Sequence, residues 1–298
     1  VLVDFNEADS SYSTRPAQGA ITIRHLLTHT SGLGYGIIDG DARMRKIYQK
    51  AGVVDLYTTE DITIAESVKR MANLPLHHDP GARFTYSEGL DVLGYLVETI
   101  SGMPYDQFLK EHLFDPLGMK DTQFYLRPNQ YRRLVPVQTK NSEGKWVEYT
   151  GHPDGYYDAS YPKTGAQRFF SGGAGLSSTA QDYARFLQMY LNGGVFNEHR
   201  ILSPATIDLI MSNQTGDLFG GGKQYYGLAF GVTTEEGFAE GVSGSAGTFD
   251  WGGYFNTQYY ADPKLELVGI LLKQTKNTPG DQTSQLLRQI VASSVVEK

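Results

Sequence analysis

Ile21-Thr-Ile-Arg-His-Leu-Leu-Thr-His-Thr-Ser-Gly-Leu33 is the most informative stretch of this 298-residue sequence. Thr22 is a preferred helix N-cap residue, and Ser31-Gly32 favours the end of a helix. Between them, apolar side chains recur on one side of a helix at Ile23, Leu26 and Leu27. The stretch therefore predicts a short helix that stops at a Ser-Gly turn.

The flanking segments are less regular. Residues 1–20 are polar, and we expect an irregular lead-in there. Residues 33–60 carry scattered glycines and charges, so we expect a loop or a partial helix. Thr63 and Glu66 have the spacing of a capping box, which predicts a helix that runs to about Asn73.

The middle of the chain predicts further helices and one hairpin. Ser87 is a good N-cap for a helix that Ser101-Gly102 would end, and Pro104 begins another. The segment Asn141–Gly144 lies between two short β-prone runs and is typical of a hairpin tip. Thr179 and Asp182 have capping-box spacing, which predicts a helix that Gly193-Gly194 would close.

In the last third of the chain, the pattern of apolar residues changes from helical spacing to β-prone runs. Residues 201–213 predict one more short helix, and then Trp251–Tyr260 and Leu265–Gln274 predict two strands joined by a turn. Residues from Asp281 to about Ser294 predict a C-terminal helix. Helices in the middle followed by a hairpin and a helix indicate an α+β protein with an antiparallel sheet.

Composition excludes several classes of protein. The formal net charge is −7, whereas a nucleic-acid binder needs a basic face. There is no cysteine, which excludes disulfides, thiolate metal sites and a cysteine nucleophile. The apolar run Leu267–Leu272 is far too short to span a bilayer.

Motifs for metal or phosphate binding are weak. His25 and His29 have i, i+4 spacing but lack the glutamate of a zinc helix, so we expect them to cap or pack rather than bind a metal. The run Gly172–Gly175 is not followed by the residues of a P-loop, and we interpret it as a close crossing of two chain segments. We interpret Gly241–Ser245, which lacks the last glycine of a nucleophile elbow, as a loop.

A Ser/Lys/Tyr hydrolase needs a different set of groups. Its nucleophilic serine lies one helical turn from a lysine, a tyrosine relays the proton, and backbone N–H groups hold the oxyanion. The sequence offers Tyr86-Ser87 before a helix and Trp251-Gly252-Gly253-Tyr254 in a β-prone run. Each is weak alone, because a buried aromatic side chain is the ordinary interpretation of Tyr86 and of Trp251.

The Ile21–Leu33 stretch resembles a hallmark of the class C β-lactamase-related serine hydrolases. That family includes penicillin-binding-protein-like peptidases and family VIII-type esterases. Five further blocks resemble the family in the same order along the chain, at residues 80–87, 90–98, 114–122, 172–182 and 251–263. The resemblance covers nearly the whole chain, and it implies a β-lactamase/transpeptidase-like fold, with an antiparallel sheet flanked by helices and a helical lobe.

The same resemblance assigns the candidate site. Tyr86 takes the place of the family's catalytic tyrosine, with Ser87 beside it in a supporting place. Trp251, Gly252 and Gly253 take the place of the third motif, which is Lys-Thr-Gly in true β-lactamases and often His-x-Gly or Trp-Gly-Gly in the esterases. The N–H of Tyr254 would then bind the oxyanion and converge with the phenol of Tyr86 on one point.

Two departures bear on the substrate. Glu88 stands where the family's β-lactamases and peptidases carry an asparagine that helps hold an amide. Trp251 stands where they carry a lysine that attracts a carboxylate. An apolar indole face suits an acyl or alcohol group better, so both departures favour an ester.

The family's S-x-x-K nucleophile motif precedes the Ile21–Leu33 block, and it is not found there. The literal match Ser142-Glu-Gly-Lys145 falls at a polar hairpin tip, too solvated to lower a lysine pKa, and we interpret it as a decoy. We therefore expect residues 1–298 to be one β-lactamase-like domain that is truncated at its N-terminus and inactive alone. Within it we expect a mainly helical lobe at 60–200 and a C-terminal sheet and helix at 220–298. The missing segment is the expected protein partner, pairing with the C-terminal hairpin.

Together these observations predict a serine hydrolase that forms an acyl-enzyme on a small-molecule ester or amide. A carboxylesterase is the leading interpretation. The alternatives are a D-amino-acid peptidase or β-lactamase, and a non-catalytic binding module that keeps the pocket. No metal or organic cofactor and no nucleic-acid partner is implied. The family favours a periplasmic or secreted location over a cytoplasmic one.

Overall fold

The computed structural model describes residues 1–151, 157–242, 244–276 and 278–295. The chain divides into two compact units. Unit 1 consists of Val1–Leu109, Phe124–Pro128 and Gly151–Leu176, and unit 2 of Lys110–Gln123, Asn129–Thr150 and Ser177–Lys298. The boundaries expected above for a helical lobe and a sheet region stay a prediction.

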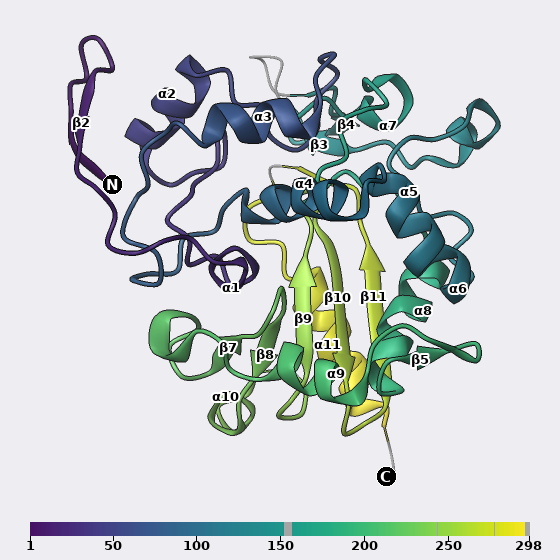
Figure 1. The fold of residues 1–298 in the computed structure, drawn as a ribbon. Helices are drawn as coiled ribbons and strands as arrows, with labels where there is room; N and C mark the ends of the chain where they lie inside the picture. The colour runs from purple at the N-terminus through teal and green to yellow at the C-terminus, as the bar shows by residue number, and fades with distance from the viewer. Residues whose placement is uncertain (152–156, 243, 277, 296–298) are drawn as a thin grey trace. The chain divides into compact units, whose positions relative to one another are not determined.

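Unit 1 is built mainly from helices (Figure 1). Two of them begin as their sequences predict, because Thr22 and Thr63 each form a capping box with the residue three positions on. The core gathers around the fully buried Met44 and Tyr48, and Leu26 packs into it. The elements are β1 (Leu2–Phe5), β2 (Tyr12–Thr14), α1 (Ile23–Leu27), α2 (Ala42–Lys50), α3 (Ile64–Met71), α4 (Gly89–Ser101), α5 (Tyr105–Leu109) and α7 (Tyr161–Thr164).

The expectation of an irregular lead-in over residues 1–20 is wrong. β1 and β2 pair as an antiparallel hairpin, and Leu2 and Phe5 pack against the core of unit 1. Asn6 holds the turn, since its side-chain oxygen accepts a hydrogen bond from the N–H of Ala8 and its own N–H donates to the carbonyl of Ser11. Strands of three or four residues are too short for their alternation to be visible in the sequence.

The prediction of Ser87 as the N-cap of α4 is also wrong by one residue. Glu88 occupies the N-cap position and makes no side-chain cap bond. The hydroxyl of Ser87 still accepts a hydrogen bond from the N–H of Gly89, over 3.3 Å. The helix ends at Gly102 as predicted, in the left-handed conformation with φ of 69°.

Unit 2 contains a five-stranded antiparallel sheet with the order β11-β10-β9-β8-β7. Its strands are β7 (Gln224–Tyr226), β8 (Gly231–Thr233), β9 (Phe249–Gly252), β10 (Thr257–Asp262) and β11 (Leu267–Leu272). The predicted C-terminal hairpin is confirmed, with Thr257 opposite Leu272 and Asp262 opposite Leu267. β11 is an outer strand, and pairing of a further segment with it stays a prediction.

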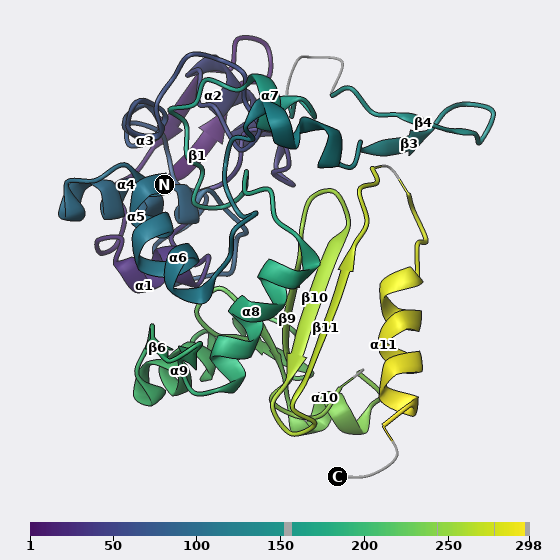
Figure 2. The ribbon, with the colours of Figure 1, turned by 90° about the vertical axis from the view of Figure 1, so that its right-hand side faces the viewer.

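Two helices cover the two faces of this sheet (Figure 2). α8 (Ala180–Leu191) packs on one face, where Leu187 meets Phe230 and Phe249 in a buried apolar cluster. α11 (Thr283–Ser293) lies on the other, where Arg288 pairs with Asp250 of β9. The alternation of β9 explains both contacts, because neighbouring residues of a strand point to opposite faces.

The remaining elements of unit 2 are short. The hairpin of β3 (Gln138–Lys140) and β4 (Trp146–Glu148) forms as predicted, with Asn141 at its turn accepting hydrogen bonds from the N–H groups of Glu143 and Lys145. The elements are η1 (Lys110–Phe114, a π-helical turn), α6 (Asp115–Leu117), η2 (Pro128–Arg133, with Pro128 in unit 1), β3 (Gln138–Lys140), β4 (Trp146–Glu148), β5 (Val195–Phe196), β6 (His199–Arg200), α9 (Pro204–Met211), η3 (Gly216–Leu218) and α10 (Glu235–Ala239).

Two local predictions in unit 2 need correction. The β-prone run Trp251–Tyr260 is not one strand, because a turn at residues 253–256 separates β9 from β10 and places Asn256 at a left-handed φ of 65°. At α8 only half of the predicted capping box forms: the Thr179 hydroxyl accepts from the N–H of Asp182. The Asp182 carboxylate instead accepts hydrogen bonds from Asp121 and Thr122.

No helix within the described ranges is long and apolar enough to cross a membrane.

Candidate active site

Tyr86 lies in unit 1, in the extended segment just before α4, and His29 holds that segment on both sides of it. The N–H of Thr85 donates to the carbonyl oxygen of His29 over 2.7 Å. The N–H of Ser87 donates to Nδ1 of His29 over 3.2 Å. The imidazole also packs on the phenol, with 4.5 Å between ring centroids. One residue of the Ile21–Leu33 stretch therefore fixes the position of Tyr86.

The tautomer and the charge of His29 follow from its hydrogen bond to Ser87 and from its burial. Its Nδ1 accepts the hydrogen bond from Ser87, so the ring proton resides on Nε2. Burial lowers the pKa of His29 from 6.5 to about 3, so the ring is neutral at physiological pH. A neutral imidazole beside Tyr86 adds no positive charge there, and its contribution is to position the tyrosine.

Exposure separates Tyr86 from its neighbours. Its side chain is 36% exposed, whereas Ser87 and Glu88 are 0% and 1% exposed. Tyr35 packs on the phenol from within unit 1, with 5.4 Å between ring centroids. Tyr86 is thus exposed directly before the buried residues Ser87–Gly89.

Unit 1 also contains three buried acids, Asp55, Glu88 and Asp91. Burial and the nearby carboxylates of Asp55 and Asp91 raise the pKa of Glu88 well above its ordinary value. This shift favours the neutral carboxylic acid, which has a hydroxyl donor and a carbonyl acceptor. Burial also raises the pKa of Asp91 to about 6. The neutral carboxyl of Glu88 offers the same two hydrogen-bonding roles as an asparagine amide.

Asp91 connects α4 to the glycine-rich loop that starts at Ser171. Its Oδ1 accepts hydrogen bonds from the hydroxyl of Ser171 over 2.6 Å and from the N–H of Gly173 over 2.8 Å. A Cβ on Gly172 would lie 2.0 Å from the carbonyl oxygen of Leu90. The interpretation of this loop as a close crossing of chain segments is confirmed.

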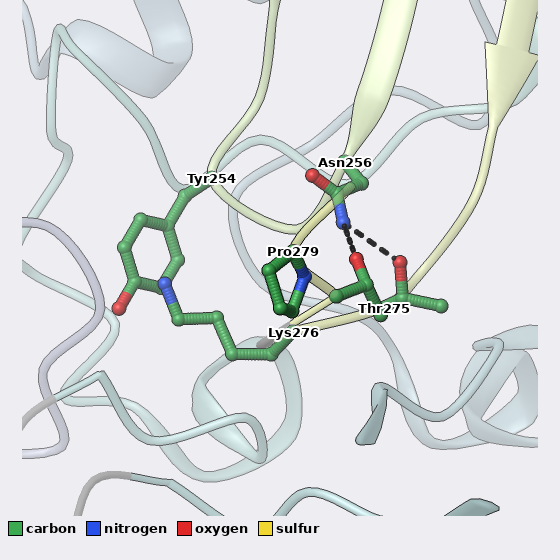
Figure 3. Close-up of a pocket in the computed structure, with 6 residues that line it drawn as sticks. Tyr254, Asn256, Thr275, Lys276 and Pro279 are labelled. Atoms are coloured by element: carbon green, nitrogen blue, oxygen red, sulfur yellow. Dashed lines mark hydrogen bonds between the residues drawn. The ribbon is translucent and has the colours of Figure 1, made fainter. Parts of the chain in front are cut away.

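Trp251, Gly252, Gly253 and Tyr254 lie in unit 2, at the end of β9 and in the turn after it. The indole packs against Tyr226, with 5.1 Å between ring centroids and 78° between ring planes. The N–H of Gly253 donates to the carbonyl oxygen of Thr257 over 2.8 Å, which closes the turn. Within unit 2 this turn presents Tyr254 beside the segment that follows β11 (Figure 3). The roles expected of these residues, and of Tyr86 and Ser87, stay predictions.

The other candidate residues from the sequence belong to local structural features. His25 completes the cap of α1 by accepting a hydrogen bond from the N–H of Thr22. Ser142 and Lys145 lie at the exposed tip of the β3–β4 hairpin, where Lys145 pairs with Glu143 over 2.8 Å. Ser243, at the centre of the rejected elbow motif, lies outside the described residues. In the described part of the chain, no group of three His, Asp or Glu side chains is arranged to hold a metal ion.

Two residues have clear roles that the sequence pattern does not predict. The pattern presents His29 only as a weak metal ligand or a packing residue, and it does not single out Asp91. Their partners lie 58 and 80 residues away in the sequence. A polar residue at a helical position that points into the core, as Asp91 does, is the one signal available.

Comparison with known proteins agrees with the fold. A sequence model of the family described as Beta-lactamase matches residues 8–292. Esterase EstB of Burkholderia gladioli is 30% identical over 86% of this chain and 65% of its own length. Protein Rv1367c of Mycobacterium tuberculosis (strain ATCC 25618 / H37Rv) is 34% identical over 88% of this chain and 64% of its own length.

Among solved structures, that of "EstCE1, a hydrolase with promiscuous acyltransferase activity" matches with a TM-score of 0.78 and 26% identity. The match covers 91% of this chain and 72% of that one. The fold is thus that of the β-lactamase-related serine hydrolases, and the chain belongs to the Beta-lactamase family. The chain spans 64% and 65% of the length of the two curated relatives.

Proposed function

We propose that the whole protein is a carboxylesterase that works through an acyl-enzyme, with Tyr86 as its general base. The observation that carries this proposal is that Tyr86 is both exposed and held in a fixed position within unit 1. Tyr86 is 36% exposed, the residues that directly follow it are buried, and two hydrogen bonds to His29 fix the backbone on either side of it. A general base must be both accessible to substrate and held in place, whereas a tyrosine packed in the core is held in place but is not accessible.

The proposed reaction has two similar halves. A serine hydroxyl, on polypeptide outside residues 1–298, attacks the ester carbonyl carbon and gives its proton to the phenolate of Tyr86. The oxyanion accepts a hydrogen bond from the N–H of Tyr254, and Trp251, Gly252 and Gly253 form the strand end that presents this group. The bond to the alcohol then breaks, and the alcohol takes the proton from Tyr86. Water repeats these steps on the acyl-serine, releasing the acid and restoring the serine.

An ester is favoured over an amide or a β-lactam. The indole of Trp251 packs against Tyr226 where the third-motif lysine would provide a positive charge. Glu88 replaces an asparagine and is buried. The similarity to EstB, an esterase, supports the same choice.

Acyl transfer to an alcohol is a second candidate function. It differs only in the final step, where an alcohol rather than water attacks the acyl-serine. EstCE1 is described as a hydrolase with promiscuous acyltransferase activity, which supports testing the same activity here. Product analysis in the presence of an added alcohol separates the two, since transfer yields a new ester and hydrolysis yields the free acid.

The test uses the full-length protein with p-nitrophenyl butyrate and a fluorophosphonate probe. We expect hydrolysis, labelling of one serine outside residues 1–298, and a fall in kcat by about 100-fold or more in Tyr86→Phe. Tyr12→Phe is a matched control, because Tyr12 is also an exposed tyrosine of unit 1, at 41%. It should keep the wild-type rate.

Two results would refute the proposal. Neither labelling nor ester hydrolysis by the full-length protein would leave the non-catalytic binding module as the better interpretation. Unchanged turnover in Tyr86→Phe, with an esterase activity present, would remove Tyr86 from the mechanism.

A further inference from the structure

Glu88 is a buried carboxyl group without a hydrogen-bond partner. Its side chain is 1% exposed, and within the described residues neither of its carboxyl oxygens is hydrogen-bonded. It occupies the N-cap position of α4 without capping the helix, because its side chain accepts no bond from a helical N–H group. Folded proteins rarely bury a polar group in this way, since water satisfies the same group in the unfolded chain. The residue lies two positions after Tyr86, the proposed general base.

The two carboxyl groups nearest to Glu88 are hydrogen-bonded. Oδ2 of Asp55 accepts two bonds of 3.1 Å from the N–H groups of residues 36–37 and one of 3.2 Å from the hydroxyl of Tyr157. Oδ1 of Asp91 accepts the two bonds already described, from a hydroxyl and from a main-chain N–H. Such donors stabilise the charged form of a carboxyl group. Negative charge is therefore better accommodated on Asp55 and Asp91 than on Glu88.

No positive charge compensates for the burial of Glu88. The titratable groups that interact with it belong to two helices and two loops, and they are Asp91 of α4, Tyr48 of α2, Asp55 after α2 and Tyr35 after α1. Within the described part of the chain, no lysine or arginine is among them. Burial and the two carboxylates raise the pKa of Glu88 well above its ordinary value. The same packing that excludes water thus favours the protonated form.

The main chain connects this buried carboxyl group to Tyr86. The N–H of Glu88 donates to the carbonyl oxygen of Gly34 over 3.1 Å. The preceding N–H, that of Ser87, donates to Nδ1 of His29 over 3.2 Å, which is one of the two bonds that hold Tyr86. Glu88 therefore belongs to the hydrogen-bonded segment that positions the phenol.

An ionised Glu88 does not fit this packing. An unpaired carboxylate is unstable away from water, and the favourable dipole at the start of α4 offsets only a small part of that instability. The helix has little room to adjust, since a Cβ on Gly89 would lie only 3.0 Å from the carbonyl oxygen of Leu26 in α1. Movement of Glu88 toward water therefore displaces Ser87 and weakens its bond to His29.

We propose that Glu88 is a positioning residue for Tyr86 that works only while its carboxyl group is protonated. This inference rests on the proposed role of Tyr86 as general base. Protonated Glu88 keeps the start of α4 packed, and Tyr86 stays in place. Ionisation of Glu88 at alkaline pH releases the segment and lowers the rate of ester hydrolysis. The protein thus has an upper pH limit that is set by a group which does not touch the substrate.

The kinetic test is the pH dependence of kcat for p-nitrophenyl butyrate, measured on the full-length protein from about pH 6 to about pH 10 with spontaneous hydrolysis subtracted. We expect the wild-type kcat to fall reversibly on the alkaline side, by up to about tenfold per pH unit. Glu88→Gln keeps a neutral side chain of similar size and should lose this fall. A merely structural role would change kcat equally at every pH.

Glu98→Gln is the matched control for this experiment. Glu98 lies on the same helix, and burial raises its pKa as well. Its carboxyl group, however, accepts a hydrogen bond from the N–H of Tyr105 over 3.0 Å, which a glutamine can also accept. We expect Glu98→Gln to keep the alkaline fall of the wild-type protein.

A measurement without substrate separates failure of this inference from failure of the esterase proposal. NMR of the full-length protein, labelled at the carboxyl carbon of glutamate and the nitrogen of serine, follows Glu88 and the N–H of Ser87 as the pH rises, and Glu88→Gln assigns the carboxyl signal. We expect both signals to shift with one midpoint, above the ordinary glutamate value of 4.5. Linked shifts in a protein that hydrolyses no ester would count against the esterase proposal alone.

Three results would overturn the inference. The first is a Glu88 carboxyl group that titrates near 4.5. The second is a Ser87 signal that does not follow the titration of Glu88. The third is a wild-type kcat without an alkaline fall, or a fall that persists unchanged in a folded Glu88→Gln protein.

Discussion

The main-chain N–H of Ser87 donates a hydrogen bond to Nδ1 of His29, a buried residue 58 positions earlier in the sequence. Together with the bond from Thr85 to the His29 carbonyl, it brackets Tyr86 on both sides. His29 itself has a left-handed φ of 52°, which a non-glycine residue adopts only where its surroundings require it. The backbone of the Ile21–Leu33 stretch is thus shaped to hold the candidate base.

Replacing His29 should separate positioning from packing. His29→Leu removes the acceptor and leaves the Ser87 N–H unsatisfied, so we expect a loss of about 1–3 kcal/mol in the free energy of unfolding. The kcat for ester hydrolysis should fall by about tenfold or more, beyond any loss of folded protein. His29→Asn keeps an acceptor near Nδ1 and tolerates the left-handed φ, so it should recover most of the kcat. Equal kcat values in the two variants would show that His29 only packs.

The same residue should make the protein sensitive to acid. The folded-state pKa of His29, about 3, lies below its ordinary value of 6.5, so the unfolded chain binds this proton more readily. Its contribution to stability is complete above pH 6.5 and is lost progressively as the pH falls toward 3. Urea unfolding between pH 7 and pH 4 should show a smaller decline in His29→Asn than in the wild-type protein. An identical decline in both would contradict this assignment.

Glu88 should have the opposite effect on the pH dependence of stability, because its contribution to stability falls as the pH rises. Its folded-state pKa is raised, so its neutral form supports folding below pH 4.5 and this support is lost as the pH rises through the raised value. Glu88→Gln removes the ionisation penalty and keeps a neutral side chain of similar size. We expect it to raise Tm at pH 8 while leaving Tm at pH 4.5 nearly unchanged. Glu60→Gln, at an exposed position of unit 1, is the control and should shift neither.

The parts of the fold that could be predicted from the sequence are those with local causes. Thr22 and Thr63 begin helices because each cap bonds to a residue three positions away. The β10–β11 hairpin could be predicted because its strands are long enough to show β-prone composition on both sides of a Pro-containing turn. The family resemblance supplied the overall architecture and the two motifs of the candidate site.

The remainder depends on contacts between distant residues, which a single sequence does not show. The bond between Asp91 and Ser171 joins residues 80 positions apart. The position of Lys276 over Tyr254 depends on the turn at 253–256, which the sequence predicts as continuous strand. The hairpin of β1 and β2 has too few residues for a pattern, and its packing on the core of unit 1 follows from the tertiary structure.

The hairpin tip that carries Ser142 and Lys145 provides a negative test. Both side chains are exposed, and Lys145 pairs with Glu143, so the pair lacks the burial that would activate a serine. We expect the double variant Ser142→Ala/Lys145→Met to keep the wild-type rate of ester hydrolysis and the same labelling by a fluorophosphonate. Loss of labelling would identify this pair as the nucleophile and refute our interpretation of the motif.

The crossing of α4 by the loop after Ser171 can be tested with two neighbouring glycines. A Cβ on Gly172 would lie 2.0 Å from the carbonyl oxygen of Leu90, so Gly172→Ala requires the loop or the helix to move. We expect it to lower the free energy of unfolding by about 1–3 kcal/mol or more. A Cβ on Gly173 would meet Asp91 and Tyr35 only at 3.4 Å, so Gly173→Ala should stay within about 1 kcal/mol of the wild type. Calorimetric melting of both variants decides the matter, because similar losses would show that backbone freedom, and not the close approach to Leu90, is what this loop requires.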